Sequence, residues 1–277
     1  MLVSLSEQLK AAKKGKYAVG LFNVVSIEML HGVFEAAEKS ASPLIIGVAE
    51  VMTEYISLEE FISLALPLAK KSPCPVTVHF DHAHNEKNIY RAIELGFNSV
   101  MYDCSSLPYA ENIKKTALMA DYAHKKGASI EAELGKVAGE EGCENVSHDI
   151  SVFTPPQCAG EFADKTKIDA LAVSIGNAHG AYKGKPLLRF DLLSDILLNT
   201  ETPLVLHGGS GIPEADFKRA ITMGITKVNI FTDINVAAAK AAYGAYKDGL
   251  GYTSLLGKIK EAVFNEAYSK MEFFKNR

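Results

Sequence analysis

The sequence predicts a (β/α)8 barrel, the TIM-barrel architecture, on three observations. First, short strand-like runs alternate along the whole chain with longer segments of helical period. Second, eight such strands are found, and they are apolar almost throughout, which is typical of strands buried on both faces. Third, no linker interrupts the 277 residues, and no GxGxxG turn follows the first strand, which disfavours an open dinucleotide-binding sheet. We therefore expect a single barrel domain over residues 1–277.

The elements follow one another from the start of the chain, where the apolar run YAVGLFNV predicts a strand and SIEMLHGVFEAAEKS a helix. Strands are expected at 17–24, 43–49, 75–81, 99–103, 129–135, 169–176, 203–209 and 227–231. Helices are expected at 26–40, 57–71, 86–96, 110–127, 155–167, 191–200 and 213–224, and a helical C-terminus from about residue 232. A polar, Gly-rich stretch at 136–154 separates the fifth strand from the next helix.

Composition excludes several function classes. A net charge of −4 and a pI near 6.1 leave no basic surplus for nucleic-acid binding. No apolar run reaches the length of a membrane span, and the N-terminus lacks the features of a signal peptide. The four cysteines are widely separated and form no CxxC pair, which favours a reducing, cytoplasmic location.

Acidic and histidine side chains collect where the expected strands end. They are Asp81 and His82, Asp103, Glu131 and Glu133, His179, and His207. Because the carboxyl ends of all strands meet at one rim of a barrel, His82, His179 and His207 are expected to converge there. Three histidines suit a catalytic zinc that keeps its fourth position open for substrate. The alternative is a set of separate rim or core histidines that bind backbone groups. Their shared place at strand ends favours the zinc site.

Two further histidines flank this region. His79 precedes Asp81 by two residues and so points to the same side of the strand, where we expect a packed, hydrogen-bonded histidine. His84 lies in a polar loop close enough to the site to support it, although no pattern requires that role.

The loops after the seventh and eighth strands predict a phosphate site. HGGSG (207–211) follows the seventh strand, and NIFTD (229–233) follows the eighth with a helix behind it. Barrels commonly bind phosphate at these two loops, through glycine N–H groups, a hydroxyl and a helix N-terminus. The alternative is a flexible turn, since Gly-rich loops alone are weak signals. Lys183 offers a cation, although an exposed loop lysine is ordinarily only solvated.

Together these segments resemble the class II ketose-bisphosphate aldolases, the zinc enzymes that include fructose- and tagatose-bisphosphate aldolase. The resemblance covers nearly the whole chain. It rests on FNV (22–24), HFDH (79–82), VMYDCS (100–105), EAELG (131–135), AVSIGNAHGAYKG (172–184), LVLHGGSGIP (204–213) and KVNIFTD (227–233).

The resemblance implies a role for each matching residue. His82, His179 and His207 would bind one zinc ion, and Asp103 and Glu133 would support it or form an alternative metal site. Asp81 would be the acid/base at the new hydroxyl, and Glu141, in a mobile loop around 136–154, would take the proton from the ketone carbon. Dihydroxyacetone phosphate would be bound by Asn23, Gly180, Lys183, Gly208, Gly209, Ser210, Asn229, Ile230, Phe231 and Thr232, in some members with a monovalent cation.

The implied reaction is the reversible aldol cleavage of a ketose (bis)phosphate, in carbohydrate metabolism such as glycolysis, by a homodimer or homotetramer. Ala49 stands where a hydroxyl residue often does, and Phe231 should reshape the pocket, so fructose 1,6-bisphosphate is not assumed to be the natural substrate. The open alternatives for the aldehyde are a different phosphosugar and an unphosphorylated acidic or neutral aldehyde. Alternatives are an aldolase for another phosphosugar, a phosphosugar isomerase or epimerase, and an inactive sugar-phosphate-binding protein. An isomerase would not need three converging histidines. The intact set of catalytic and ligand residues disfavours the inactive protein.

Overall fold

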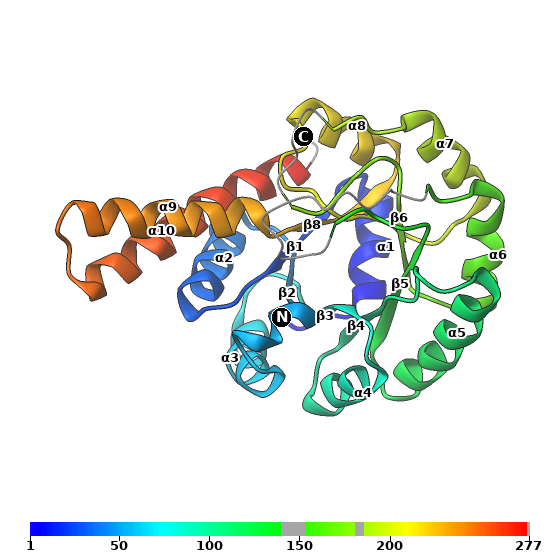
Figure 1. Cartoon of the computed structure of the whole chain (residues 1–277), viewed down its shortest axis with the longest axis horizontal. Coiled ribbons are helices and arrows are strands. Elements are labelled where there is room, and N and C mark those ends of the chain that lie inside the picture. Colours follow the sequence, from blue (N-terminus) through cyan, green and yellow to red (C-terminus); the bar gives the residue numbers. More distant parts are fainter. Residues whose placement is uncertain (140–152, 181–185, 276–277) are drawn as a thin grey trace.

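The computed structural model describes residues 1–139, 153–180 and 186–275, and it contains the predicted barrel. Eight parallel strands close in sequence order, with β1 paired to both β2 and β8 (Figure 1). The strands are β1 Val19–Asn23, β2 Leu44–Ala49, β3 Val76–Ala83, β4 Ser99–Tyr102, β5 Ser129–Leu134, β6 Ala170–Val173, β7 Leu204–Leu206 and β8 Ile225–Ile230. Every residue of these strands is buried, which explains their apolar composition.

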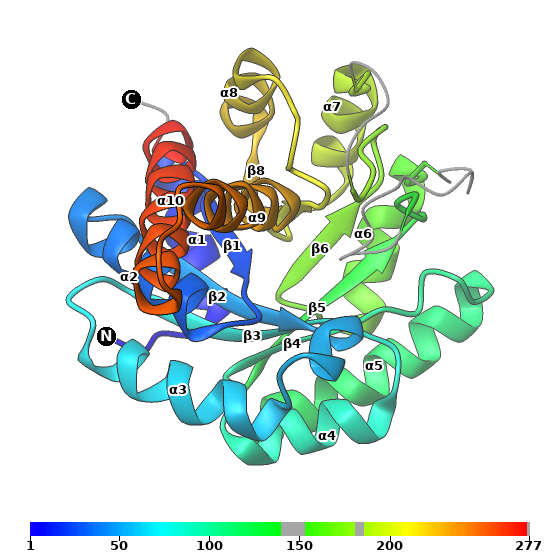
Figure 2. The same cartoon turned by 60° about the vertical axis from the view of Figure 1, so that its left-hand side comes forward.

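Helices surround the strands, as the views from two directions show (Figures 1 and 2). They are α1 Leu5–Gly15, α2 Ile27–Ser40, α3 Leu58–Lys71, α4 Glu86–Leu95, α5 Tyr109–Lys125, α6 Pro156–Thr166, α7 Phe190–Asn199, α8 Glu214–Met223, α9 Thr232–Lys247 and α10 Tyr252–Phe274, with a short 3-10 helix η1 at Glu50–Glu54. Polar caps fix several starts. Ser57 and Glu60 form a capping box at α3, and the side chain of Asn85 accepts a hydrogen bond from the N–H of Lys87 at α4.

Helix α1 was not predicted, and it closes the N-terminal end of the barrel. Leu5 and Leu9 of this helix pack against the barrel-interior residues Val19 and Ile45. Gln8 donates hydrogen bonds to the backbone oxygens of Leu44 and of the residue before β3. The lower half of the barrel is therefore an apolar core, and the polar interior side chains lie nearer the opposite rim.

The predicted helical C-terminus is a pair of helices. Helices α9 and α10 pack on each other and extend beyond the barrel as an arm at the left of Figure 1, with α10 also packed along α2. None of the helices in the described part of the chain has both the length and the apolar character needed to cross a bilayer. The expected single domain over residues 1–277 stays a prediction, and most of the predicted loop 136–154 lies outside the described residues.

Candidate functional site

The three predicted histidines come together at the C-terminal rim of the barrel. Potential ligand nitrogens of His82, His179 and His207 all lie within 4.8 Å of one another, and all three side chains are buried. The ring of His82 is 4.4 Å from that of His207 and 4.7 Å from that of His179 between centroids. The alternative of separate rim histidines therefore does not describe this chain.

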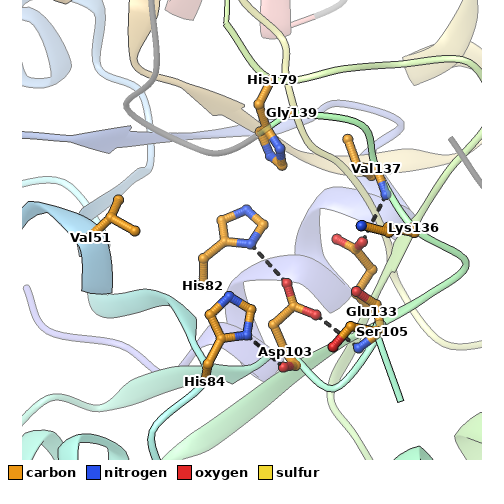
Figure 3. A pocket seen from close by; sticks show the side chains of 11 residues that line it. Val51, His82, His84, Asp103, Ser105, Glu133, Lys136, Val137, Gly139 and His179 are labelled. Carbon is orange, nitrogen blue, oxygen red and sulfur yellow. Dashed lines mark hydrogen bonds and ion pairs between the residues drawn. The ribbon is translucent and has the colours of Figure 1, made fainter. Parts of the chain in front are cut away.

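Carboxylates fix the orientation of two of these rings. His82 Nδ1 lies 3.2 Å from an oxygen of Asp103, and His207 Nε2 lies 2.8 Å from an oxygen of Glu131 (Figure 3 shows the first of these). A carboxylate accepts, so each of these nitrogens is a donor, and in the neutral ring the other nitrogen has the lone pair. Those nitrogens, His82 Nε2 and His207 Nδ1, are buried and have no hydrogen-bond partner among the described residues. Clustered ring nitrogens of this kind, buried and without a hydrogen-bond partner, fit a metal ion whose ligands are oriented by carboxylates.

The electrostatics of the site also favour a cation. Burial alone would lower the pKa of His82, but the carboxylates of Asp81 and Asp103 raise it to about 10. Burial and the charge of Asp103 raise the pKa of Glu133 to about 8. A positive charge is thus stabilised at this position, and a divalent ion would supply it in place of the proton. The residues present therefore fit the predicted zinc ion.

An irregularity in β3 lets neighbouring side chains serve the same site. Consecutive residues of a regular strand point to opposite faces, yet Asp81 and His82 are both needed at the barrel rim. The pairing of β3 with β4 shifts register between Phe80 and Ala83, and His82 has a φ of 45°. A left-handed residue at a bulge re-aims its side chain and is strained unless its surroundings hold it. The contact with Asp103 supplies part of that support.

Beneath the histidines lies a buried ion pair that the sequence patterns did not reveal as a unit. Lys227 Nζ of β8 is 2.7 Å from Glu131 Oε2 of β5, and neither side chain is exposed. Although burial alone would raise the pKa of Glu131, Lys227 and His207 lower it to about 2. Glu131 is therefore an anion that accepts from His207. The available signal was the presence of charged residues inside two buried strands, Glu131 and Glu133 in β5 and Lys227 in β8.

Asp81 is held by amide side chains at the centre of the barrel mouth. Asn23 Nδ2 donates to it at 2.8 Å, and Asn229 Nδ2 donates to its two oxygens at 3.2 and 3.1 Å. His79, which is packed as expected, has Nδ1 2.7 Å from Ser99 Oγ and Nε2 3.4 Å from Asp81. Burial would raise the pKa of Asp81, but His82 and His79 hold it well below its usual value. The carboxylate of Asp81 is thus ionised.

The two predicted phosphate loops lie side by side. The N–H of Gly209 donates to the backbone oxygen of Asn229 at 3.0 Å, and the N–H of Asp233 donates to Ser210 Oγ at 3.1 Å. Helix α9 begins at Thr232, so its N-terminal N–H groups open beside these residues. This is the arrangement expected for a phosphate.

Gly208 allows this loop to approach its neighbour. Its φ is 62°, and a Cβ there would lie 2.0 Å from the backbone oxygen of Ala178, next to His179. Only glycine fits such a position. Gly180 also has a positive φ, of 82°, in the neighbouring segment. Ile230 ends β8, and Phe231 is 7% exposed and packed in the main apolar core.

The cavity beside the histidines is about 280 Å³ in volume, and Figure 3 shows the side chains that surround it. It is lined by Val51, His82, His84, Asp103, Ser105, Ser106, Glu133, Lys136, Val137, Gly139 and His179. Phe231 is not among the described residues that line this cavity, so no direct contact supports the expected effect of its ring on the pocket. Ligand atoms of Asp103 and Glu133 lie with one of His82 within 4.8 Å, as the predicted alternative site requires. Glu141 and Lys183 lie outside the described residues.

Comparison with known proteins finds aldolases along the whole chain. Residues 3–277 match the family described as "Fructose-bisphosphate aldolase class-II". The chain is 38% identical to the probable fructose-bisphosphate aldolase of Bacillus subtilis (strain 168), over 99% of this chain and 97% of that protein. It is also 38% identical to the sulfofructosephosphate aldolase of Alkalicoccus urumqiensis, over 98% and 96% respectively. The crystal structure of the YdjI aldolase from Escherichia coli K12 superposes with a TM-score of 0.90 and 36% identity, covering 99% of this chain and 97% of that one.

Proposed function

Because this chain belongs to the class II fructose-bisphosphate aldolase family, and is therefore a carbon–carbon lyase, we propose that it is zinc-dependent and cleaves a ketose (bis)phosphate to dihydroxyacetone phosphate and an aldehyde. The observation that carries the zinc dependence is the histidine cluster, in which His82 Nε2 and His207 Nδ1 are buried, unpartnered and oriented by carboxylates. An isomerase or epimerase has no need of such a cluster. The proposal includes Asp103 and Glu133 as an alternative metal site. It also includes a monovalent cation bound beside the phosphate.

The chain's own residues divide the work of the reaction. A zinc ion at the histidines would act as a Lewis acid that stabilises negative charge on the substrate oxygens. Glu141 takes the proton from the ketone carbon, and Asp81 gives a proton to the aldehyde oxygen during condensation or removes it during cleavage. Asn23 and Asn229 hold Asp81 in place. The loops at 208–210 and 229–232, with Gly180 and Lys183, bind the phosphate.

Proton exchange on dihydroxyacetone phosphate tests this proposal without knowledge of the aldehyde. In D₂O the zinc-loaded protein is expected to exchange one C–H hydrogen of the ketone for deuterium stereospecifically. NMR measures the loss of that C–H signal, and a chelator should stop the exchange. Glu141→Ala should lose exchange because it lacks the base, whereas Glu140→Ala, a change of the same kind at the neighbouring position, should retain it. Absence of exchange in zinc-loaded protein would count against the aldolase reaction with this donor.

Asp81→Asn separates the two halves of the reaction. The amide has nearly the same shape but cannot take up the hydroxyl proton, so cleavage should fall by about 10²- to 10⁴-fold. Exchange on dihydroxyacetone phosphate should persist, since the base for that step is Glu141. The measurement is the ratio of cleavage to exchange rates, with Asp121→Asn on the exposed face of α5 as control. Equal loss of both rates would assign Asp81 to the structure of the site instead.

We also propose a homodimer or homotetramer in the cytoplasm. The α9–α10 arm carries large side chains that face solvent in the single chain, with Tyr243, Tyr246 and Tyr252 exposed by 68%, 76% and 73%. Exposed aromatic groups of this kind are typical of surfaces that pack against another subunit. Analytical ultracentrifugation would measure the mass, and a monomer at micromolar concentration would oppose the proposal. The cytoplasmic location rests on the spacing of the cysteines, and cell fractionation tests it.

A further inference from the structure

One wall of the cavity beside the histidines carries polar groups to which the proposed chemistry gives no role. His84, Ser105 and Ser106 line the cavity together with the apolar Val51. They come from the segments after β2, β3 and β4, whereas the phosphate loops follow β7 and β8. A substrate whose phosphate lies in those loops and whose ketone reaches the histidines would extend its aldehyde fragment toward this wall.

A backbone contact fixes the orientation of the His84 ring and the nitrogen that donates. Its Nδ1 lies 2.9 Å from the backbone oxygen of Asp103. A carbonyl oxygen only accepts, so Nδ1 is the donor, and in the neutral ring Nε2 keeps an acceptor lone pair. Figure 3 shows Nε2 on the edge of the ring that is turned away from Asp103. His84 therefore offers an acceptor to a ligand in the cavity.

The loop that carries His84 is held by one carboxylate. Glu50 Oε2 accepts from the N–H of His84 at 2.7 Å and from the N–H of Asn85 at 3.2 Å, and its Oε1 accepts from Asn88 Nδ2 at 2.7 Å. Glu50 opens the short helix η1, and the next residue, Val51, is itself a wall of the cavity. These bonds hold an exposed histidine in one place, which lowers the entropy lost when it binds a ligand.

The charges around the cavity disfavour an anionic fragment at this end. Among the described lining residues Lys136 is the one lysine or arginine, while Asp103 and Glu133 both lie on the walls. The end of β2 provides no hydroxyl, because its last residue is Ala49. A second phosphate would meet the carboxylate of Asp103, whereas sugar hydroxyls match the imidazole and serine side chains.

We propose that His84 Nε2 accepts a hydrogen bond from a hydroxyl of the aldehyde fragment, and that His84 is a specificity-determining residue for uncharged hydroxyaldehydes. The inference rests on the proposed aldolase function. It predicts that the natural ketose carries its phosphate on the dihydroxyacetone end and an uncharged polyhydroxylated chain on the other.

Condensation of dihydroxyacetone phosphate with paired aldehydes tests this role. Glyceraldehyde and propanal have the same carbon chain and differ in their hydroxyls. His84→Ala should lower kcat/KM for glyceraldehyde by about 3- to 10-fold, the effect of one hydrogen bond, and that for propanal by less than about 2-fold. His84→Gln, which restores an acceptor, should recover part of the loss. His31→Ala, on an exposed face of α2, is the matched control.

Two results would overturn the inference. One is an equal loss for both aldehydes in both His84 variants, which would mean that the residue only supports the site. The other is a preference of the unmodified protein for glyceraldehyde 3-phosphate over glyceraldehyde. Exchange on dihydroxyacetone phosphate separates these failures from failure of the proposed function: without exchange both proposals fall, and with exchange only the role of His84 does.

Discussion

Replacing His82 by alanine is expected to lower aldol cleavage by at least about 10³-fold, the effect of losing several kcal/mol of charge stabilisation. The ring of His82 lies closer to the other two rings of the cluster than they lie to each other, and Asp103 supports it. Removing it takes away one of three ligands and leaves Asp103 without its imidazole partner. The zinc content of the purified variant, measured by atomic absorption, should fall in parallel with activity.

Metal depletion of the unmodified protein provides the comparison. Chelated protein should lose activity and regain it when zinc is added, because its ligands are intact. His82→Ala should not regain activity under the same treatment, and His31→Ala should retain both zinc and activity. A fully active His82→Ala protein with a complete complement of zinc would remove this residue from the metal site.

The sequence predicted the barrel because its strands are nearly uniform apolar runs and its helices keep their period. Once the barrel was predicted, the convergence of His82, His179 and His207 followed, because the carboxyl ends of all strands meet at one rim. It did not predict helix α1, which precedes the first expected strand. Nor did it predict the left-handed backbone at His82, because a bulge depends on pairing with β4 and not on a local pattern.

The residues that support the histidines could not be predicted from the sequence, because they come from distant parts of the chain. Glu131 and Lys227 are 96 residues apart and become neighbours only when the barrel closes. A charged residue in a buried strand indicates that a partner exists, but it does not say which one. His84 shows the same limit, since its orientation depends on the backbone of Asp103 and on Glu50 from another loop.

Lys227→Met should destabilise the fold by about 3–5 kcal/mol, because it leaves Glu131 charged and buried without its partner. Methionine keeps most of the length and volume of lysine, so the lost packing is small. The free energy of unfolding from urea denaturation of the metal-free protein measures the effect. Since Glu131 also orients His207, zinc affinity should fall by about 10- to 100-fold.

A double-mutant cycle distinguishes a lost ion pair from lost packing. Glu131→Gln removes the buried negative charge, so Lys227→Met combined with Glu131→Gln should be more stable than Lys227→Met alone. The double variant should nevertheless keep the weak zinc binding, because glutamine cannot support His207 as a carboxylate does. Additive losses of stability would show that the two charges do not stabilise each other. Stability restored without metal affinity would assign Glu131 two separable tasks, one in the barrel core and one at the histidines.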